Sequence, residues 1–149
     1  MGLLNEIAGT RLYLDANVFI YALEGYPDFV DELISLTDEL LRGTYHAVTS
    51  ELTLADCLVK PIADRQDVWI ETYQKAVQTS ATLSVVPVSR SILIEAANIR
   101  ASTGLRLPDA IHASTSRILS CTSFLTNDGK FRSVQGLNVL VLSDVIFLP

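Results

Sequence analysis

Acidic residues lie at four places in this sequence that could together hold a metal ion. Asp15 follows an apolar stretch, Glu51 and Asp56 lie further along, Asp109 comes after a glycine-containing segment, and Asp128 lies in "FLTNDGK". Carboxylates that converge in a fold repel one another and lose hydration, which is costly unless a cation lies among them. A ligand set made only of oxygen favours Mg²⁺ or Mn²⁺ over Zn²⁺. Such a site suits metal-assisted hydrolysis of a phosphodiester bond.

Each of these acids also has an ordinary structural explanation. Asp is a favoured N-cap, so Asp15 could simply cap the helix that follows it. Asp109 suits the electrostatics of a helix N-terminus, and Asp128 lies in the turn sequence "NDG". Glu51 or Asp56 alone would be a solvated helix position. The joint placement of the acids beside strand ends and helix starts favours a functional site.

The elements that must position these acids alternate between strands and helices. Strands are predicted at 10–15, 45–50, 83–88, 121–126 and 137–142, and helices at 16–23, 27–43, 51–60, 63–81, 89–104 and 108–119. Ser50 is the expected N-cap of the third helix, and Pro61 is expected to end it. This alternation predicts a three-layer α/β/α domain with a mainly parallel five-stranded sheet. Ligands of such sheets bind at the carboxyl ends of the strands, where the acids lie.

The totals of the sequence fit one folded domain over residues 1–149. Hydrophobic residues make up 49% and charged residues 19% of the chain, as in globular proteins. No apolar run reaches the roughly 20 residues of a membrane span, and the N-terminus lacks the features of a signal peptide. We therefore expect a cytoplasmic protein with no membrane association. Cys57 and Cys121 have no metal-binding spacing and are predicted to be buried, reduced thiols.

The net charge of −6 weighs against a broad basic surface for nucleic acid. It leaves nucleic acid open as a substrate, because an acidic cluster that holds cations makes the whole chain look anionic. The few basic residues can still line one groove.

Four segments of the sequence together resemble a known family. "LYLDANVFIYAL", "AVTSELTLADCLVKP", "GLRLPDAIHAS" and "FLTNDGKF", in that order, are similar to the four acidic motifs of PIN-domain ribonucleases, especially the VapC-type toxins of bacterial toxin–antitoxin pairs. The likeness covers nearly the whole chain. It implies a Rossmann-like sheet and an endoribonuclease that depends on Mg²⁺ or Mn²⁺ and cleaves RNA. It also implies a small antitoxin partner and a homodimer.

The resemblance implies specific roles for the acids. Asp15, Asp109 and Asp128 would hold the metal, directly or through water, and an acid on the helix after the second strand would complete the site. The family usually has Glu there, in a pattern like "SxLTLAE", and this chain has Asp56. Glu51 is the alternative because it lies nearer the strand end. The two are five residues apart, about 140° around a helix, so both are not expected to face one ion.

Several further side chains are candidates for supporting the site. Asn17 could hydrogen-bond Asp15 or simply cap the helix, and the two roles are compatible. Thr126 and Asn127 could orient Asp128 or bind phosphate. The predicted contacts to the RNA backbone come from Arg106, Lys130 and Arg132, which ordinary surface charge explains equally well. His112 is expected to be a packed helix histidine, because a metal-activated water needs no general base.

Two other functions are compatible with acids at strand ends. In the first, the replacement of Glu by Asp56 has lowered catalysis so far that the chain is a PIN-like module that binds RNA or protein. The second is a phosphoryl-transfer receiver or a phosphatase of the haloacid dehalogenase type. It is disfavoured because "LDANV" lacks a DxD pair and no Lys follows a late strand.

Overall fold

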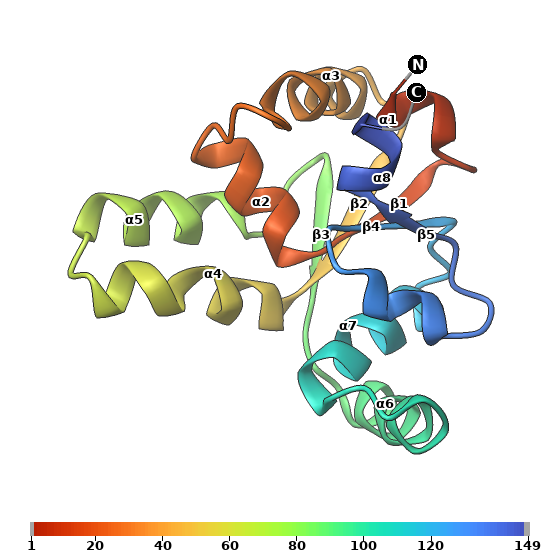
Figure 1. Cartoon of the computed structure of the whole chain (residues 1–149). Helices are drawn as coiled ribbons and strands as arrows, with labels where there is room; N and C mark the ends of the chain where they lie inside the picture. Colours follow the sequence, from red (N-terminus) through yellow and green to blue (C-terminus); the bar gives the residue numbers. More distant parts are fainter. Residues whose placement is uncertain (1, 148–149) are drawn as a thin grey trace.

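The computed structural model describes residues 2–147, in which a parallel sheet lies between helices (Figure 1). The strands are β1 (Arg11–Leu14), β2 (His46–Ser50), β3 (Leu83–Val86), β4 (Ser123–Thr126) and β5 (Val139–Val141). The helices are α1 (Leu3–Glu6), α2 (Ala16–Leu23), α3 (Val30–Leu41), α4 (Glu51–Ala63), α5 (Asp67–Ala76), α6 (Arg90–Thr103), α7 (Leu107–Ile118) and α8 (Leu142–Phe147), with a 3₁₀ helix η1 (Gly129–Ser133).

The sheet has the strand order β3-β2-β1-β4-β5, and every neighbouring pair is parallel. The predicted α/β class is confirmed, and the sheet is wholly rather than mainly parallel. The chain runs outward from β1 in one direction and returns to build β4 and β5 on the other side. The strand order therefore reverses between β1 and β4, and the carboxyl ends of strands at such a switch point are the usual place for a ligand.

Two separate cores cover the two faces of the sheet. Leu12 and Leu14 of β1 pack into one core with residues of α2 and α3, whereas Tyr13 packs into the other with residues of α6 and α7. Successive strand residues point to opposite faces, so this split follows from the two-residue period of β1. The alternation places Asp15, the next residue after the strand, on the same side as Tyr13.

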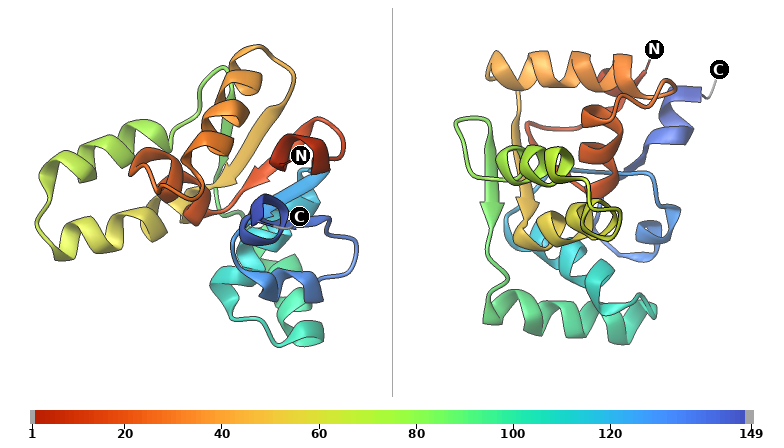
Figure 2. Two further views of the ribbon diagram at one scale, coloured as in Figure 1. Left: turned by 45° about the horizontal axis from the view of Figure 1, so that its top comes forward. Right: turned by 90° about the vertical axis from the view of Figure 1, so that its left-hand side faces the viewer.

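Helices α4 and α5 form a hairpin that extends to one side of the sheet (Figures 1 and 2). The prediction that Pro61 ends the third helix is wrong, because α4 continues to Ala63. Proline in the last turn removes one backbone hydrogen bond, and the buried ring of Pro61 packs against its surroundings. The turn after α4 has Arg65 in a left-handed conformation, with φ of 55°.

Other predicted boundaries shift by a few residues. The helix expected at 63–81 is shorter, since α5 ends at Ala76 and the Ser/Thr-rich segment after it forms a turn. In that turn the Ser80 amide donates to the Leu83 carbonyl, and the Thr79 hydroxyl accepts from the Val85 amide. At the other end, α8 begins at Leu142 and so shortens the fifth predicted strand.

The structure also bears on the cysteines and on membrane spans. Cys57 is buried as predicted, Cys121 is only partly buried, and both are free thiols. Within residues 2–147, every helix is too short or too polar to cross a lipid bilayer.

A close approach of two chain segments sets the start of β1 against the start of β4. Gly9 has φ of +66°, and a Cβ at this position would lie 2.4 to 2.6 Å from side-chain atoms of Thr122. The Thr122 hydroxyl lies 3.1 Å from the amide nitrogen and 3.0 Å from the carbonyl oxygen of Arg11. The absence of a side chain at Gly9 therefore lets the two strands begin side by side.

We expect Gly9→Ala to destabilise the protein more than Gly25→Ala. Gly25 has nearly the same φ, +68°, but a Cβ added there would meet no atom of the described residues within 4 Å. Both substitutions should lose about 1–2 kcal/mol from the left-handed backbone, and Gly9→Ala a further 1–3 kcal/mol or so from overpacking. Urea unfolding of the two variants measures the difference, and equal losses would contradict the steric explanation.

Candidate functional site

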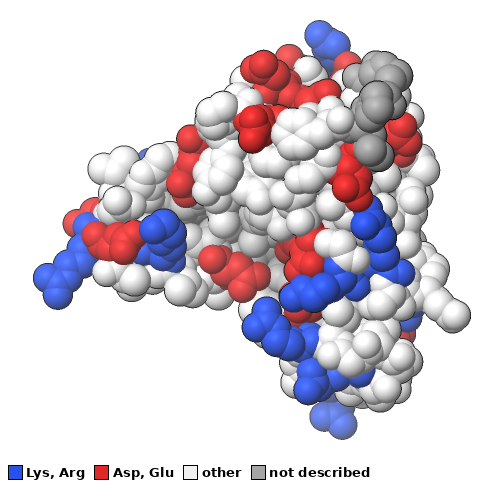
Figure 3. Space-filling view, in the orientation of Figure 1, with Lys and Arg blue, Asp and Glu red and all other residues white. Residues whose placement is uncertain are grey.

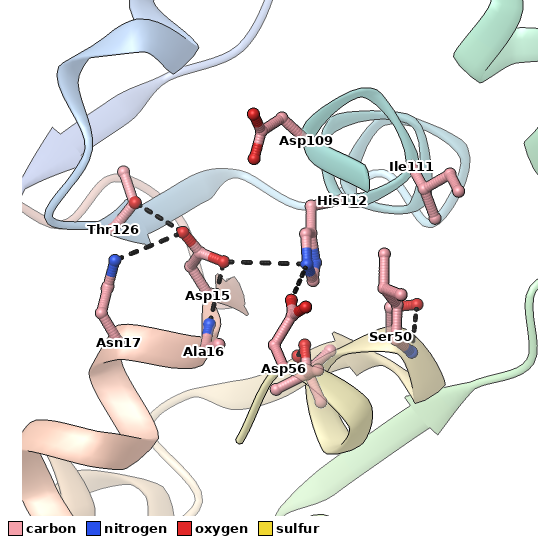
Figure 4. A network of polar contacts seen from close by, with 12 residues as sticks. Asp15, Ala16, Asn17, Ser50, Asp56, Asp109, Ile111, His112 and Thr126 are labelled. Atoms are coloured by element: carbon pink, nitrogen blue, oxygen red, sulfur yellow. Dashed lines mark hydrogen bonds and ion pairs between the residues drawn. The ribbon is translucent and has the colours of Figure 1, made fainter. Parts of the chain in front are cut away.

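Asp15 is a buried carboxylate at the end of β1, with 7% of its surface exposed. It is the N-cap of α2, and its Oδ1 accepts a hydrogen bond of 2.8 Å from the Ala16 amide. Its Oδ2 accepts from the Thr126 hydroxyl at 2.7 Å and lies 3.5 Å from the side-chain nitrogen of Asn17 (Figure 4). Burial raises the pKa of Asp15, although the charge of His112 and the Thr126 hydrogen bond act in the opposite direction. Asp15 is thus both a helix cap and a buried charge.

Thr126 and Asn17, two of the predicted supporting residues, connect the segments that follow β1 and β4. The Thr126 hydroxyl, besides donating to Asp15, accepts from the Asp128 amide at 3.0 Å. The Asn17 side-chain oxygen accepts from the Asn127 amide at 3.1 Å. These bonds place Asp15 and the backbone of Asp128 close together.

The side chain of Asn127 does not face the acids. Its nitrogen donates to the Tyr21 hydroxyl at 3.1 Å, and its oxygen accepts from the amide and hydroxyl of Ser143 at 2.9 and 2.8 Å. Asn127 therefore connects the loop after β4 to α2 and α8, and its side chain is not oriented toward Asp128 or a phosphate.

Asp56 reaches the site through a histidine. Its Oδ2 lies 2.8 Å from Nε2 of His112, and the same nitrogen lies 3.9 Å from Oδ1 of Asp15. His112 is buried on α7, and its Nδ1 lies 2.7 Å from the Tyr13 hydroxyl. Burial acts to lower the pKa of His112, but the Asp56 hydrogen bond and the nearby carboxylates outweigh it, so the pKa is raised. Figure 4 shows Asp15 and Asp56 both pointing toward this imidazole.

Glu51 lies apart from this network. It is the first residue of α4 and is exposed, and within residues 2–147 its carboxylate has no hydrogen bond or ion pair. Of the two acids considered on this helix, only Asp56 contacts a residue that also approaches Asp15.

Asp109 and Asp128 lie on either side of one ammonium group. Nζ of Lys130 is 3.9 Å from Oδ2 of Asp109 and 3.4 Å from Oδ2 of Asp128. Asp128 also caps η1, with Oδ1 accepting from the Lys130 amide at 3.0 Å. Oδ2 of Asp109 is buried without a hydrogen-bond partner among the described residues, and Arg106 Nε lies 3.7 Å away. This oxygen therefore lies beside two basic groups without a hydrogen bond from either.

Basic side chains gather beside the acids, over α6 and α7 (Figure 3). Arg106 and Lys130 line a cavity of about 460 Å³ together with Asp109. Arg132 forms an ion pair with Asp144 of α8, so its guanidinium is already engaged. Among the three predicted RNA contacts, Arg106 and Lys130 are the two that lie at the acids.

The donor chemistry of the acids fits a hard divalent cation. Asp15, Asp109 and Asp128 offer only oxygen, and the buried Asp109 Oδ2 lacks a hydrogen-bond partner among the described residues. No group of three or more His, Cys, Asp or Glu side chains within residues 2–147 is already arranged around a metal position. Instead, Lys130 and His112 lie between pairs of carboxylates. Binding of an ion among these three acids would therefore require side-chain rearrangement.

The link between Tyr13, His112 and Asp56 is not predicted from the sequence. Part of its signal is present there, because His112 follows Asp109 by three residues and therefore lies on the same face of α7. Tyr13 precedes Asp15 by two residues and shares its side of the sheet. The contact with Asp56 depends on how α4 packs near α7, which no local pattern indicates.

Comparison with solved structures identifies similar folds. One chain of VapBC2 from Rickettsia felis, bound to a promoter DNA fragment, matches with a TM-score of 0.69 and 17% identity, over 88% of this chain and 98% of that chain. A chain of FitAcB from Neisseria gonorrhoeae matches with a TM-score of 0.66 and 18% identity, over 87% and 96% of the two chains. A toxin–antitoxin complex from Klebsiella pneumoniae gives a TM-score of 0.64 and 19% identity, over 87% and 95%.

These low identities show a shared fold, and the family is shown by the sequence itself. No curated protein sequence matches this chain. The model of the PIN domain family matches residues 12–137, which include Asp15, Asp56, Asp109 and Asp128. The resemblance drawn from the four acidic segments is confirmed, and the chain belongs to the PIN domain family.

Proposed function

We propose that this protein is an endoribonuclease that uses Mg²⁺ or Mn²⁺ to hydrolyse RNA. The observation that carries the proposal is the buried Asp109 Oδ2, which lacks a hydrogen-bond partner among the described residues and belongs to a group of carboxylates at the edge where the strand order reverses. Membership of the PIN domain family, a family of nucleases, supports the same reaction class. The oxygen-only donor set is what hard divalent ions prefer.

In this proposal Asp15, Asp109 and Asp128 hold the ion and Asp56 completes the site. When bound, the ion supplies positive charge that activates water and stabilises the leaving oxygen. Thr126 fixes the orientation of Asp15 through its hydroxyl. Lys130 is a partner of the acids in the metal-free chain. We propose that Lys130, together with Arg106, contacts a phosphate of the RNA once the acids are neutralised.

We also propose that the protein is the toxin of a toxin–antitoxin pair, cytoplasmic and homodimeric, with a small antitoxin as partner. The support is a likeness of fold to chains from VapBC and FitAB complexes. A small open reading frame beside the gene, encoding a DNA-binding protein that copurifies with this chain and blocks its activity, would support the pairing. RNA cleavage unaffected by that neighbour would contradict it.

A binding module without catalysis is the second candidate function. The observation in its favour is that His112 and Lys130 pair with the carboxylates, so the charges of the site are partly balanced without a metal ion. Calorimetric titration with Mn²⁺ separates the two functions, since the nuclease must bind the ion and the module need not.

We expect Asp15→Asn to stabilise the metal-free protein at neutral pH. Burial raises the pKa of Asp15 in the folded state. When an acid has a raised pKa in the folded state, the unfolding free energy of the protein is highest below the unfolded-state pKa of about 4. It falls as the pH rises through the folded-state pKa, because the buried group then becomes charged. The variant should therefore exceed the wild type in unfolding free energy near pH 7, and this excess should shrink near pH 3. Urea unfolding in EDTA measures it, and an excess that is independent of pH would argue against a buried charge.

We expect Asp109→Asn to abolish Mn²⁺-dependent cleavage of a single-stranded RNA. Loss of a metal ligand should reduce the rate by more than the roughly 10- to 100-fold that follows loss of an outer partner. Asp64→Asn is the matched control, because Asp64 pairs with Lys60 at the far end of α4. Equal cleavage by wild type and Asp109→Asn would rule out the proposed site.

The two acids on α4 can be separated by a pair of amide substitutions. Asp56→Asn should weaken Mn²⁺ binding and slow cleavage, because Asp56 is the acid that contacts His112 beside Asp15. Glu51→Gln should leave both unchanged within about twofold, since Glu51 is exposed and lies outside this network. Calorimetry and a cleavage assay on each variant decide between them, and the reverse result would assign the role to Glu51.

A further inference from the structure

We propose that His112 is a positioning residue that holds the carboxylate of Asp56 toward Asp15. The proposal rests on the proposed metal-dependent function. It explains how this chain uses an aspartate at the position where its family usually has a glutamate. Its basis is the pair of short contacts at the two imidazole nitrogens, 2.8 Å to Asp56 and 2.7 Å to Tyr13.

The imidazole is held in one orientation by its surroundings. Only 2% of the His112 surface is exposed. The Tyr13 ring is fully buried and stacks on Phe124 with a centroid distance of 4.9 Å and an interplanar angle of 6°. Because Tyr13 lies on the central strand and cannot swing away, its hydroxyl is a fixed partner for Nδ1. The other nitrogen is then aimed at Asp56 (Figure 4).

The donors and acceptors match along the series of hydrogen bonds from Tyr13 through His112 to Asp56. An ionised carboxylate only accepts, so Nε2 of His112 donates to Oδ2 of Asp56. Nδ1 then accepts from the Tyr13 hydroxyl when the imidazole is neutral and donates to the Tyr13 oxygen when it is protonated, so Nε2 donates to Asp56 in both states. Every polar atom of the buried ring is satisfied in this arrangement.

Asp56 needs such support more than a buried acid would. Its side chain is 39% exposed, so water competes for its oxygens. Aspartate also has one methylene fewer than glutamate and reaches less far from α4. A bond from a fixed donor selects the rotamer that points inward and leaves Oδ1 of Asp56 free to face the metal position. Partners of this kind orient metal-binding carboxylates and raise the affinity of the site.

His112 orients Asp56 and does not act directly on Asp15. Nε2 of His112 lies 3.9 Å from Oδ1 of Asp15, too far for a hydrogen bond. Asp15 already accepts bonds from the Ala16 amide and the Thr126 hydroxyl, so its orientation does not depend on His112.

The test compares Mn²⁺ affinity by calorimetry in the full-length wild type and two variants. His112→Leu, which removes both polar contacts, should weaken binding about 10- to 100-fold. His112→Gln, whose amide retains a donor toward Asp56, should bind Mn²⁺ within a few-fold of the wild type. Thermal unfolding in EDTA shows which variants are folded. If His112→Leu does not fold, the Mn²⁺ affinity of His112→Gln still tests the proposal. A folded His112→Gln variant whose Mn²⁺ affinity is 10-fold or more below that of the wild type would overturn the proposal.

A double variant distinguishes positioning from a general structural role. In an Asp56→Ala background, His112→Gln and His112→Leu should change the Mn²⁺ dissociation constant by less than twofold, because the carboxylate that His112 positions is gone. Additive losses in the double variant would show that His112 acts otherwise and would overturn the proposal. Absence of Mn²⁺ binding in the wild type would instead overturn the proposed function and, with it, this inference.

Discussion

The buried carboxylate of Asp15 is the constraint on which the site depends. A charge with 7% exposure between two apolar cores is unfavourable unless its oxygens are hydrogen-bonded. The chain meets this requirement with donors from two different elements, the first amide of α2 and the hydroxyl that ends β4. The Thr126 hydroxyl is within reach only because β1 and β4 are neighbours in the sheet. Burial of the charge therefore depends on the strand pairing at the switch point.

The remaining acids are arranged by pairing each with a cationic or hydrogen-bonding neighbour. Lys130 lies between Asp109 and Asp128, and His112 lies between Asp56 and Asp15. These contacts reduce the mutual repulsion that carboxylates at one edge would otherwise impose on the folded chain. In the proposed metal complex the ion would replace the contacts of Lys130, whereas the bond from His112 to Asp56 would remain. The same few side chains would thus set both the stability of the metal-free chain and its affinity for the ion.

The architecture leaves the carboxyl edge of the sheet accessible while both faces are covered. The two cores on opposite faces fix the strands, Asp15 caps the helix that follows β1, and Asp56 lies in the second turn of the helix that follows β2. Helix α7 adds Asp109 and His112 from the other face. Three elements that are far apart in the sequence therefore supply side chains to one small region, which is why burial of the sheet and assembly of the site occur together.

Local patterns in the sequence were sufficient for the order and type of the main elements. The alternation of apolar strands with amphipathic helices fixes a parallel α/β sheet, and Asp15, Asp109 and Asp128 follow strands or begin helices by position alone. Element ends were less predictable, because Pro61 is tolerated in the last turn of α4 and a Ser/Thr turn stops α5.

Tertiary structure decided which side chains meet. The sequence does not indicate that Asn127 turns toward Tyr21 and Ser143, or that Asp56 rather than Glu51 contacts His112. These contacts join residues as many as 106 positions apart, and they depend on how the helices pack across the sheet. Hydrophobic periodicity records which face of a helix is buried but carries no information about which polar group of another element lies opposite it. For that reason the acids were evident from the sequence, and their partners were not.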